Sequence, residues 1–330
     1  MGFWRGKTVL VTGAGGFVGR ALTRALLRRG AYVVALVRDR QPACARPLRH
    51  RLYPVRSQVQ DLASLERIMA QFQPDAVIHL ASQALVGPAL THPLETFETN
   101  IRGTYHMLEV CRRHGAKLAA VVIASSDKAY GECHDLPYRE SHPLAGRHPY
   151  DVSKSCADLL AASYAHTYAL PVTIARCGNI FGPGDVHFSR LVPSVVHALY
   201  HGQPPVLRSD GTPVRDFLYL ADAVRAYLLL AQQARRPDVV GQAFNFSLET
   251  GCSVLEMVRK IAALMGVLDL APRIEASATH EIGRQLLCAD KARRLLGWSP
   301  RYTLDAALAR TIEWYRGYFA RTQGRARRAA

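Results

Sequence analysis

The fold of this chain is decided by residues 8–19, which read TVLVTGAGGFVG. Thr8–Thr12 is a β-branched, apolar run typical of a buried strand. The glycines that follow permit a tight turn, a close approach of backbone to a pyrophosphate, and close packing of the next helix on the strand. A helix N-terminus at this position attracts phosphate, because its N–H groups are unpaired. We therefore predict a dinucleotide-binding turn whose contacts come from Gly13, Gly15, Gly16, Phe17, Val18 and Gly19.

Outward from this turn, short apolar runs alternate with amphipathic stretches, which is the pattern of βαβ units around a parallel sheet. Strands are expected at Thr8–Thr12, Tyr32–Arg38, Arg51–Val55, Ala76–Ala81, Leu118–Ser125 and Val172–Arg176. Helices are expected at Phe17–Arg29, Ala63–Gln71, Pro93–His114 and Tyr150–Tyr168. The pattern predicts an α/β fold with a Rossmann-type, doubly wound parallel sheet that binds ligands at the carboxyl ends of its strands.

The pattern changes after Gly178, where the sequence becomes irregular and richer in glycine and proline. Residues 181–185 and 204–213 are interpreted as loops. We expect residues 1–178 to form an NAD(P)-binding Rossmann domain and residues 179–330 to form mainly a smaller, loop-rich C-terminal region that binds the substrate. About residues 214–250 of this second part are expected to return to the first domain.

Composition excludes several other classes of protein. The chain has 330 residues, 49% of them hydrophobic and 21% charged, which are globular values rather than those of a disordered or collagen-like chain. Its seven cysteines are scattered without a CxxC pair, so we expect neither a disulfide framework nor a metal site. No apolar run approaches the roughly 20 residues that span a bilayer, and the first strand leaves no room for a signal peptide. We expect a soluble, cytoplasmic protein with no membrane partner.

The net charge is the unusual global feature. Forty-two lysines and arginines face 26 acidic residues, a formal +16 at pH 7. Such an excess suggests an anionic partner: nucleic acid, an acidic membrane surface or a phosphorylated small molecule. The sequence has no helix-turn-helix signature and no basic motif with interleaved aromatics, so we expect no nucleic-acid partner. A nucleotide-sized anion is the favoured partner, although most of the excess charge is not assigned to a function.

The end of the second expected strand should contact the adenosine ribose of a dinucleotide. Arg38 there favours NADP, because an arginine accommodates the 2′-phosphate, whereas the neighbouring Asp39 keeps NAD open, because a carboxylate bonds the free 2′-hydroxyl. Asp61 and Leu62, after the third strand, are placed to meet the adenine. Asp61 is equally well interpreted as a helix N-cap.

A catalytic pair is expected at the start of the last predicted helix. Tyr150 and Lys154 lie four residues apart, so they share one helix face. A lysine beside a tyrosine favours the phenolate and lowers the pKa of the phenol from its usual value near 10. Next to a nicotinamide, such a pair can remove a proton from a carbinol as hydride leaves it.

Several motifs together make the chain resemble the extended short-chain dehydrogenase/reductases of the NAD-dependent epimerase/dehydratase family, which act on nucleotide sugars. The resemblance extends over nearly the whole chain. Its motifs are residues 12–19, His79-Leu80-Ala81, Ser125-Ser126, Tyr150 with Lys154, residues 176–184 (RCGNIFGPG), residues 215–222 (RDFLYLAD) and residues 295–300 (LLGWSP).

Within that family, the residues after Ser126 indicate the reaction. Asp127-Lys128 is similar to the acid and base pair of nucleotide-sugar 4,6-dehydratases, most of all to members resembling CDP-glucose 4,6-dehydratase. Oxidation of the sugar at C4 acidifies the C5 proton, and loss of water then needs a base at C5 and an acid at the C6 hydroxyl. Lys128 and Asp127 would fill these roles. An alternative is that Asp127 caps a turn and Lys128 is a solvated charge.

The resemblance also implies roles for residues at matching positions. The catalytic set would be Ser126, Asp127, Lys128, Tyr150 and Lys154, with Ser126 bonding the C4 oxygen. The cofactor would be tightly bound NAD(P), with further contacts from Leu80, Ala81, Ser82, Asn100, Tyr150 and Lys154. His79 is either near the nicotinamide or a core histidine. A nucleoside diphosphate-hexose would contact Ser126, Asn179, Arg190, Leu191, Arg215 and Arg284, although Arg190 and Arg284 are also readily interpreted as solvated surface arginines.

Three functions therefore stay open. The first is a dehydratase that makes an NDP-4-keto-6-deoxyhexose and regenerates its cofactor, and a related 5,6-dehydration without return of hydride is its variant. The second is an epimerase that uses Tyr150 and Lys154 while Asp127 and Lys128 stand idle. The third is a non-catalytic dinucleotide sensor. The base and the sugar are not decided by these motifs. By resemblance, we also expect a homodimer joined by a four-helix interface from Pro93–His114 and Tyr150–Tyr168.

Overall fold

The computed structural model describes residues 2–42, 44–277 and 281–329, with side chains up to residue 323. Within these residues, the largest sheet has seven strands in the order β10-β6-β5-β4-β1-β2-β3, all of them parallel. The chain order reverses between β1 and β4, and such a switch point opens a crevice at the carboxyl ends of the strands. The predicted α/β class is confirmed. The strands are β1 (Thr8–Thr12), β2 (Tyr32–Val37), β3 (Leu52–Arg56), β4 (Ala76–His79), β5 (Ala120–Ser126), β6 (Val172–Cys177) and β10 (Ala243–Phe246).

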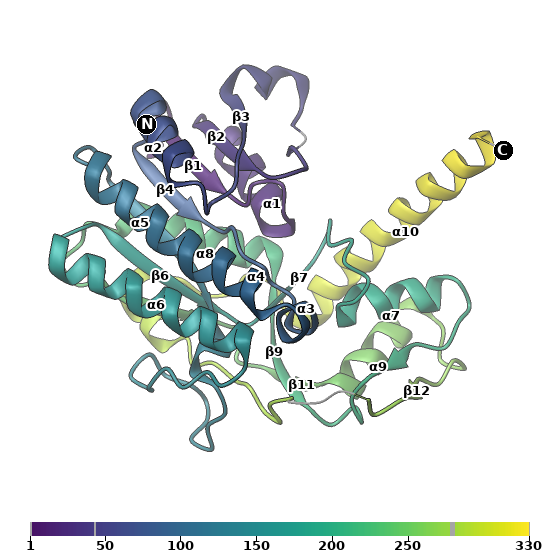
Figure 1. Ribbon diagram of the computed structural model, residues 1–330. Helices are drawn as coiled ribbons and strands as arrows, with labels where there is room; N and C mark the ends of the chain where they lie inside the picture. The colour runs from purple at the N-terminus through teal and green to yellow at the C-terminus, as the bar shows by residue number, and fades with distance from the viewer. Residues whose placement is uncertain (1, 43, 278–280, 330) are drawn as a thin grey trace.

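Helices cover both faces of this sheet (Figure 1). Side chains alternate between the faces, so that Val9 and Val11 join one buried cluster while Leu10 joins the other. Because both faces are buried, β1 is an uninterrupted apolar run in the sequence. One face carries α1 (Phe17–Arg28) and α8 (Leu220–Gln233), and the other carries α2 (Leu62–Phe72), α5 (Gly103–His114) and α6 (Pro149–Tyr168).

A smaller region packs beside the carboxyl ends of the strands (Figure 1). Its core brings three helices together with a short sheet. The helices are α7 (Leu191–Tyr200), α9 (Val254–Met265) and α10 (Leu304–Ala329), and the short sheet has the order β11 (Gly251–Ser253), β9 (Val214–Tyr219), β7 (Asn179–Phe181).

Two segments that we interpreted as loops contain strands. Phe181 ends β7, and β8 (Val206–Leu207) pairs with β12 (Arg273–Ile274). Both pairings join segments far apart in the sequence, so the local glycine and proline content did not indicate them.

The helix expected over 93–114 is interrupted. It forms as α4 (Pro93–Phe97), a π-helical segment (Glu98–Arg102) and α5, and it is preceded by the short helix α3 (Val86–Thr91). Single π-helical turns occur often at functional sites, where they redirect a side chain. Here the turn presents Asn100 to the loop after β4. None of the helices formed by the described residues combines the length and hydropathy that crossing a membrane requires.

Candidate active site

A large cavity lies at the carboxyl ends of β1, β4 and β5. Its volume of about 1360 Å³ exceeds the roughly 300–1,000 Å³ typical of a single ligand, so it has room for a dinucleotide and a second ligand together. Most of the predicted site residues line it: Gly13, Gly15, Gly16, Phe17, Val18, Gly19, Arg38, Asp39, Leu80, Ala81, Ser82, Ser126, Lys128, Tyr150, Lys154, Asn179, Arg190, Leu191 and Arg215. The predicted residues outside its lining are Asp61, Leu62, Asn100, Asp127 and Arg284.

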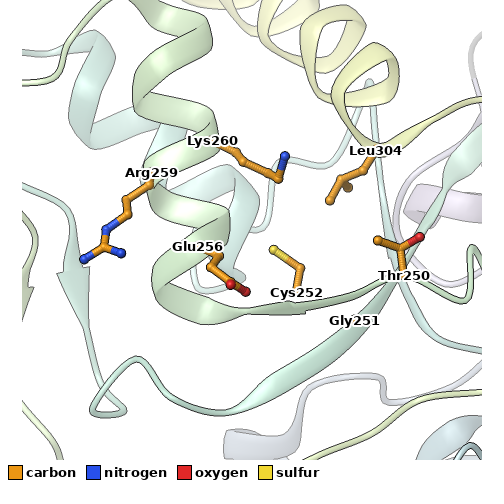
Figure 2. Close-up of a pocket in the computed structure, with 7 residues that line it drawn as sticks. All are labelled: Thr250, Gly251, Cys252, Glu256, Arg259, Lys260 and Leu304. Atoms are coloured by element: carbon orange, nitrogen blue, oxygen red, sulfur yellow. The ribbon is translucent and has the colours of Figure 1, made fainter.

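A second, smaller cavity lies beside α9, between β11 and the start of α10 (Figure 2). Its charged groups already have partners: Lys260 bonds Asp305 at 2.8 Å, and Glu256 closes the N-terminal capping box of α9 with Ser253. None of the predicted site residues lines it. The large cavity is therefore the candidate site.

The glycine turn forms a cradle that side chains would fill. Gly13 has φ +65°, and a Cβ there would lie 2.8 Å from the backbone nitrogen of Ala81. A Cβ on Gly19 would lie 2.1 Å from the carbonyl oxygen of Gly13, so α1 can approach β1 this closely only without a side chain. α1 also begins without a side-chain cap and without an acidic residue in its first turn. This donor set fits the pyrophosphate of a dinucleotide.

His79 supports the glycine turn through the Thr12 hydroxyl. The Thr12 hydroxyl accepts hydrogen bonds from the backbone N–H groups of Leu80 and Ala81, each at 3.1 Å, and its oxygen lies 2.9 Å from His79 Nδ1. His79 Nε2 lies 3.3 Å from the Thr104 hydroxyl, which itself donates to the Asn100 carbonyl. Burial lowers the pKa of His79 to about 3, so this imidazole is neutral. The structure therefore shows His79 as a core histidine with partners on both ring nitrogens.

Arg38, Asp39 and Ser57–Gln60, which follow β2 and β3, line another part of the cavity. Arg38 and Asp39 pair with each other at 2.8 Å on the exposed rim. Asp61 lies outside the lining because its carboxylate caps α2 and accepts from the Ser64 N–H at 3.0 Å. Leu62 begins that helix and packs against the core. The adenine contacts expected from Asp61 and Leu62 stay a prediction, while the loop just before them, Ser57–Gln60, lines the cavity.

Asn100 supports the site without lining it. Its Oδ1 accepts from the Ser82 hydroxyl at 3.0 Å and from the Gln83 N–H at 2.7 Å, and its Nδ2 donates to the Ser153 hydroxyl at 2.9 Å. Ser153 in turn donates to the carbonyl of Tyr150 at 2.7 Å. The hydrogen bonds of this amide fix the Ser82 loop against α6, and a contact of Asn100 with a cofactor stays a prediction.

Tyr150 and Lys154 lie on the first turns of α6, as the spacing predicts. Lys154 Nζ donates to the Ala124 carbonyl at 3.0 Å and lies 5.9 Å from the centroid of the Tyr150 ring. Burial lowers the pKa of Lys154 to about 8. Burial also raises the pKa of Tyr150 above its usual value, opposed by a hydrogen bond with Ser126. Desolvation dominates the pKa of both side chains, so the net shift of the phenol pKa is upward even with Lys154 nearby.

The segment after β5 presents a second pair of ionisable groups. Ser126 caps the short 3₁₀ turn Asp127–Tyr130: its oxygen accepts from the Lys128 N–H at 3.3 Å, and its hydroxyl donates to Asp127 Oδ1 at 2.8 Å. Asp127 is buried, and its Oδ2 has no hydrogen-bond partner among the described residues. Burial raises the pKa of this carboxyl, so it holds a proton more readily than an exposed aspartate. Ser126, not Asp127, is therefore the cap of this turn.

Lys128 lines the cavity and is not a freely solvated charge. Its Nζ donates to Gln285 Oε1 at 2.5 Å. Burial lowers the pKa of Lys128, and the nearby Arg215 lowers it further, against the carboxylates of Asp127, Asp151 and Glu281. The chain thus places a carboxyl with a raised pKa beside an amine with a lowered one, next to Ser126 and Tyr150.

The predicted anion-binding arginines have different surroundings. Arg215 is buried, donates to the Ile282 carbonyl at 2.6 Å and lies 3.5 Å from the Glu281 carboxylate. Arg190 lines the cavity and pairs with Asp185 at 3.0 Å. Arg284 is exposed and lies outside the lining.

Several further polar residues line the cavity without being among the predicted site residues, and Arg20, Arg208 and Ser125 are three of them. Arg20 and Arg208 reach the cavity while donating to the carbonyls of Gly184 at 2.8 Å and Ser189 at 3.3 Å. In an arginine-rich sequence no local signal separates these two from surface arginines. Ser125 also lines the cavity, and its buried hydroxyl has no partner within the described residues. The Ser-Ser repeat before Asp127 was the signal that could have found it.

Comparisons with known proteins bear on this site. The family model described as "NAD dependent epimerase/dehydratase family" matches residues 9–245. The dTDP-glucose 4,6-dehydratase of Neisseria gonorrhoeae is 31% identical over 94% of this chain and 95% of its own length. The CDP-glucose 4,6-dehydratase of Salmonella typhimurium is 30% identical over 96% of this chain and 92% of its own.

Solved structures with this fold include both types of enzyme. A dTDP-glucose 4,6-dehydratase from Streptomyces venezuelae with NAD bound aligns with a TM-score of 0.83 and 30% identity, over 94% of this chain and 97% of its own. A UDP-glucose 4-epimerase from Thermotoga maritima with UDP-glucose aligns with a TM-score of 0.86 and 26% identity, over 94% and 99%. The overall fold therefore does not separate dehydration from epimerisation, and the side chains of the site must do so.

Proposed function

The chain belongs to the NAD dependent epimerase/dehydratase family, and on this premise we propose that it is a nucleotide-sugar 4,6-dehydratase, a lyase that converts an NDP-hexose to the NDP-4-keto-6-deoxyhexose. The observation that carries the proposal is the pair of a buried carboxyl, Asp127, and a half-buried amine, Lys128, beside Tyr150. An epimerase of this family needs an acid and base only at the C4 hydroxyl. Elimination of water across C5 and C6 needs a second acid and a second base, and this chain supplies both.

The residues that would hold the dinucleotide are those of the glycine cradle, the Arg38–Asp39 rim, residues 80–82 and Lys154. When bound, the dinucleotide supplies a hydride acceptor at C4 and a hydride donor at C6, so it ends each turnover as it began. We propose NAD rather than NADP. Asp39 is a suitable partner for the free 2′-hydroxyl, and the guanidinium of Arg38 already has a partner in Asp39 at 2.8 Å.

The first chemical stage takes place at C4. Tyr150 accepts the proton of the C4 hydroxyl, and Ser126 donates a hydrogen bond to the same oxygen, which holds the sugar in place. Lys154, whose pKa is lowered to about 8, keeps a positive charge near the phenol over part of the neutral range. Tyr150 can accept the C4 proton only as the phenolate, and the nearby ammonium of Lys154 favours the phenolate over the phenol.

The second stage is the elimination. Lys128 as the neutral amine takes the C5 proton, and Asp127 as the carboxylic acid gives a proton to the departing C6 hydroxyl, which leaves as water. The direction of each pKa suits its role, because burial favours the neutral form of both side chains. Asp127 Oδ1 already accepts from Ser126, so Oδ2 is the oxygen free to carry the acidic proton.

We propose that the substrate is a nucleoside diphosphate-hexose whose diphosphate meets Arg215 and Arg190, with Asn179 at the junction to the sugar. These side chains line the same cavity as the glycine turn, and arginine suits phosphate oxygens because its guanidinium donates as a fork. dTDP-glucose and CDP-glucose are the first candidates, since relatives with these activities are about equally similar to this chain. The Asp-Lys form of the pair favours CDP-glucose.

We also propose the homodimer and the cytoplasmic location expected from the family. On α6, Leu159 is 59% and Tyr168 is 50% exposed, a surface that a second copy can cover. Figure 1 shows α6 and α5 side by side on the outer face of the sheet.

The test of function is incubation of the purified chain with dTDP-glucose, CDP-glucose, UDP-glucose and GDP-mannose. Dehydration gives a product lighter by one water that develops the absorbance of a 4-keto-6-deoxy sugar in alkali. The double variant Asp127→Asn, Lys128→Met is expected to lose this product while Tyr150 and Lys154 remain. Formation of a C4 epimer alone would instead support the epimerase, to which the Thermotoga maritima structure is similar. No conversion of any sugar, with dinucleotide still bound, would support the sensor.

A further inference from the structure

Gln285 lies directly behind the amine of Lys128. Its side chain is fully buried, and its Oε1 accepts the 2.5 Å hydrogen bond from Lys128 Nζ. Both an ammonium and a neutral amine can donate an N–H to an amide oxygen, so this contact persists in either protonation state of the lysine. Gln285 does not itself line the cavity, whereas Lys128 does.

The backbone holds Gln285 in a fixed position. Its N–H donates to the Val214 carbonyl at 3.0 Å, next to Arg215 on β9. The following residue, Leu286, accepts from the Tyr138 N–H at 2.7 Å. Hydrogen bonds thus fix the backbone at Gln285 and at the next residue. The side-chain amide of Gln285 is therefore a fixed acceptor for Lys128.

Packing alone does not explain an amide at this position. Gln285 Nε2 is buried without a hydrogen-bond partner among the described residues, and such an orphaned donor costs roughly 1–3 kcal/mol. A methionine would fill a similar space without this cost. What the amide adds is an acceptor that carries no charge.

We propose that Gln285 is a positioning residue for the elimination step, which holds the amine of Lys128 toward the cavity through a neutral acceptor and adds no negative charge behind it. The inference rests on the proposed dehydratase function and names a residue outside the reacting groups. With one N–H of the neutral amine given to Gln285, the lone pair of that nitrogen is free to point at the C5 proton.

The charge of the group that accepts from Lys128 matters, because both acidic and basic side chains surround this lysine. The groups that act on it are Asp127 on its own turn, Asp151 on α6, Arg215 on β9 and Glu281 before Gln285. Of these groups, the three carboxylates favour the ammonium and Arg215 favours the amine. A further carboxylate in direct contact would favour the ammonium strongly, and only the amine can act as a base.

The test is the pH profile of kcat for 4-keto-6-deoxy product formation from dTDP-glucose and CDP-glucose by the wild-type chain, Gln285→Glu and Gln285→Met. In Gln285→Glu the acidic limb of the profile is expected to move up by about 1–3 pH units, the effect of an adjacent opposite charge. In Gln285→Met the limb is expected not to move up, and kcat falls with little change in KM because C4 oxidation is untouched. Gln242→Glu is the matched control, since Gln242 also accepts from a lysine, Lys291 at 2.8 Å, but lies outside the cavity.

Each outcome decides the inference. A profile that keeps its shape in Gln285→Glu, with the rate lowered equally at every pH, would show a merely structural role and overturn it. If Gln285→Glu does not fold, an unchanged kcat in Gln285→Met would overturn it instead. If the wild-type chain forms only a C4 epimer, the proposed dehydratase function is wrong. That result differs from the one that overturns only the role of Gln285, which is a dehydratase whose pH profile is the same in Gln285→Glu.

Discussion

Replacing Asp127 by asparagine tests the acid of the elimination while leaving its shape intact. Ser126 can still donate to the retained oxygen, because the present bond is made to Oδ1 at 2.8 Å. The amide nitrogen then occupies the place of Oδ2, the oxygen that has no partner within the described part of the chain. An amide cannot give up a proton as a carboxylic acid does, so the substitution removes only the acid function.

The magnitude follows from the role. General acid catalysis contributes typically about 10²–10⁴-fold in rate, which corresponds to roughly 3–5 kcal/mol of barrier. We expect kcat for the 4-keto-6-deoxy product to fall by that factor. KM should change little, because asparagine keeps the shape of the aspartate and can keep its hydrogen bond from Ser126. C4 oxidation should continue, so the reduced nicotinamide is expected to accumulate during a single turnover.

The assay is stopped-flow absorbance of the reduced nicotinamide alongside product formation. Asp305→Asn is a suitable control, since Asp305 pairs with Lys260 on the surface at 2.8 Å. Asp127→Asn should also be no less stable than the wild type at pH 7. A raised pKa means that the wild-type carboxyl favours folding below its unfolded pKa and loses that contribution as pH rises. Full dehydratase activity in a folded Asp127→Asn protein would refute the assignment.

Three further predictions concern the cofactor turn, a buried carboxyl and the C4 base. Gly19→Ala should lose dinucleotide binding and about 1–3 kcal/mol of stability, because its Cβ would lie 2.1 Å from the Gly13 oxygen. Thermal unfolding with and without NAD measures both effects, and Gly283→Ala, whose Cβ meets nothing within 4 Å, should show neither. Asp216 has its pKa raised by burial to about 7, so its contribution to stability is complete below about pH 4 and is lost as pH rises to about 7. Asp216→Asn should flatten this part of the stability profile in urea unfolding, and an unchanged slope would contradict the assignment. Tyr150→Phe should lower C4 oxidation by at least about 10²-fold while NAD still binds, which rapid mixing and calorimetry can separate.

Local sequence was sufficient for the sheet and the glycine turn. The strand, the three glycines and the following helix are neighbours in the chain, so one stretch specifies their geometry. The same holds for Tyr150 and Lys154, which share a helix face through their spacing alone.

Other parts of the site depend on contacts that spacing does not indicate. Gln285 meets Lys128 across 157 residues, and Arg20 meets the Gly184 carbonyl across 164. The pKa of Tyr150 is governed by how deeply the phenol is buried, which no motif records. Asp61 caps α2, the second of the two interpretations that the sequence allowed, and its spacing alone could not show this.

The most direct measurement of the central claim is the product that the wild-type chain forms from CDP-glucose and dTDP-glucose in deuterated water, analysed by NMR. Removal of the C5 proton by Lys128, followed by protonation at C5 after hydride return to C6, predicts a 4-keto-6-deoxy sugar that carries deuterium at C5. A C4 epimer without deuterium at C5 would contradict the account, because it would show that Asp127 and Lys128 take no part in the reaction.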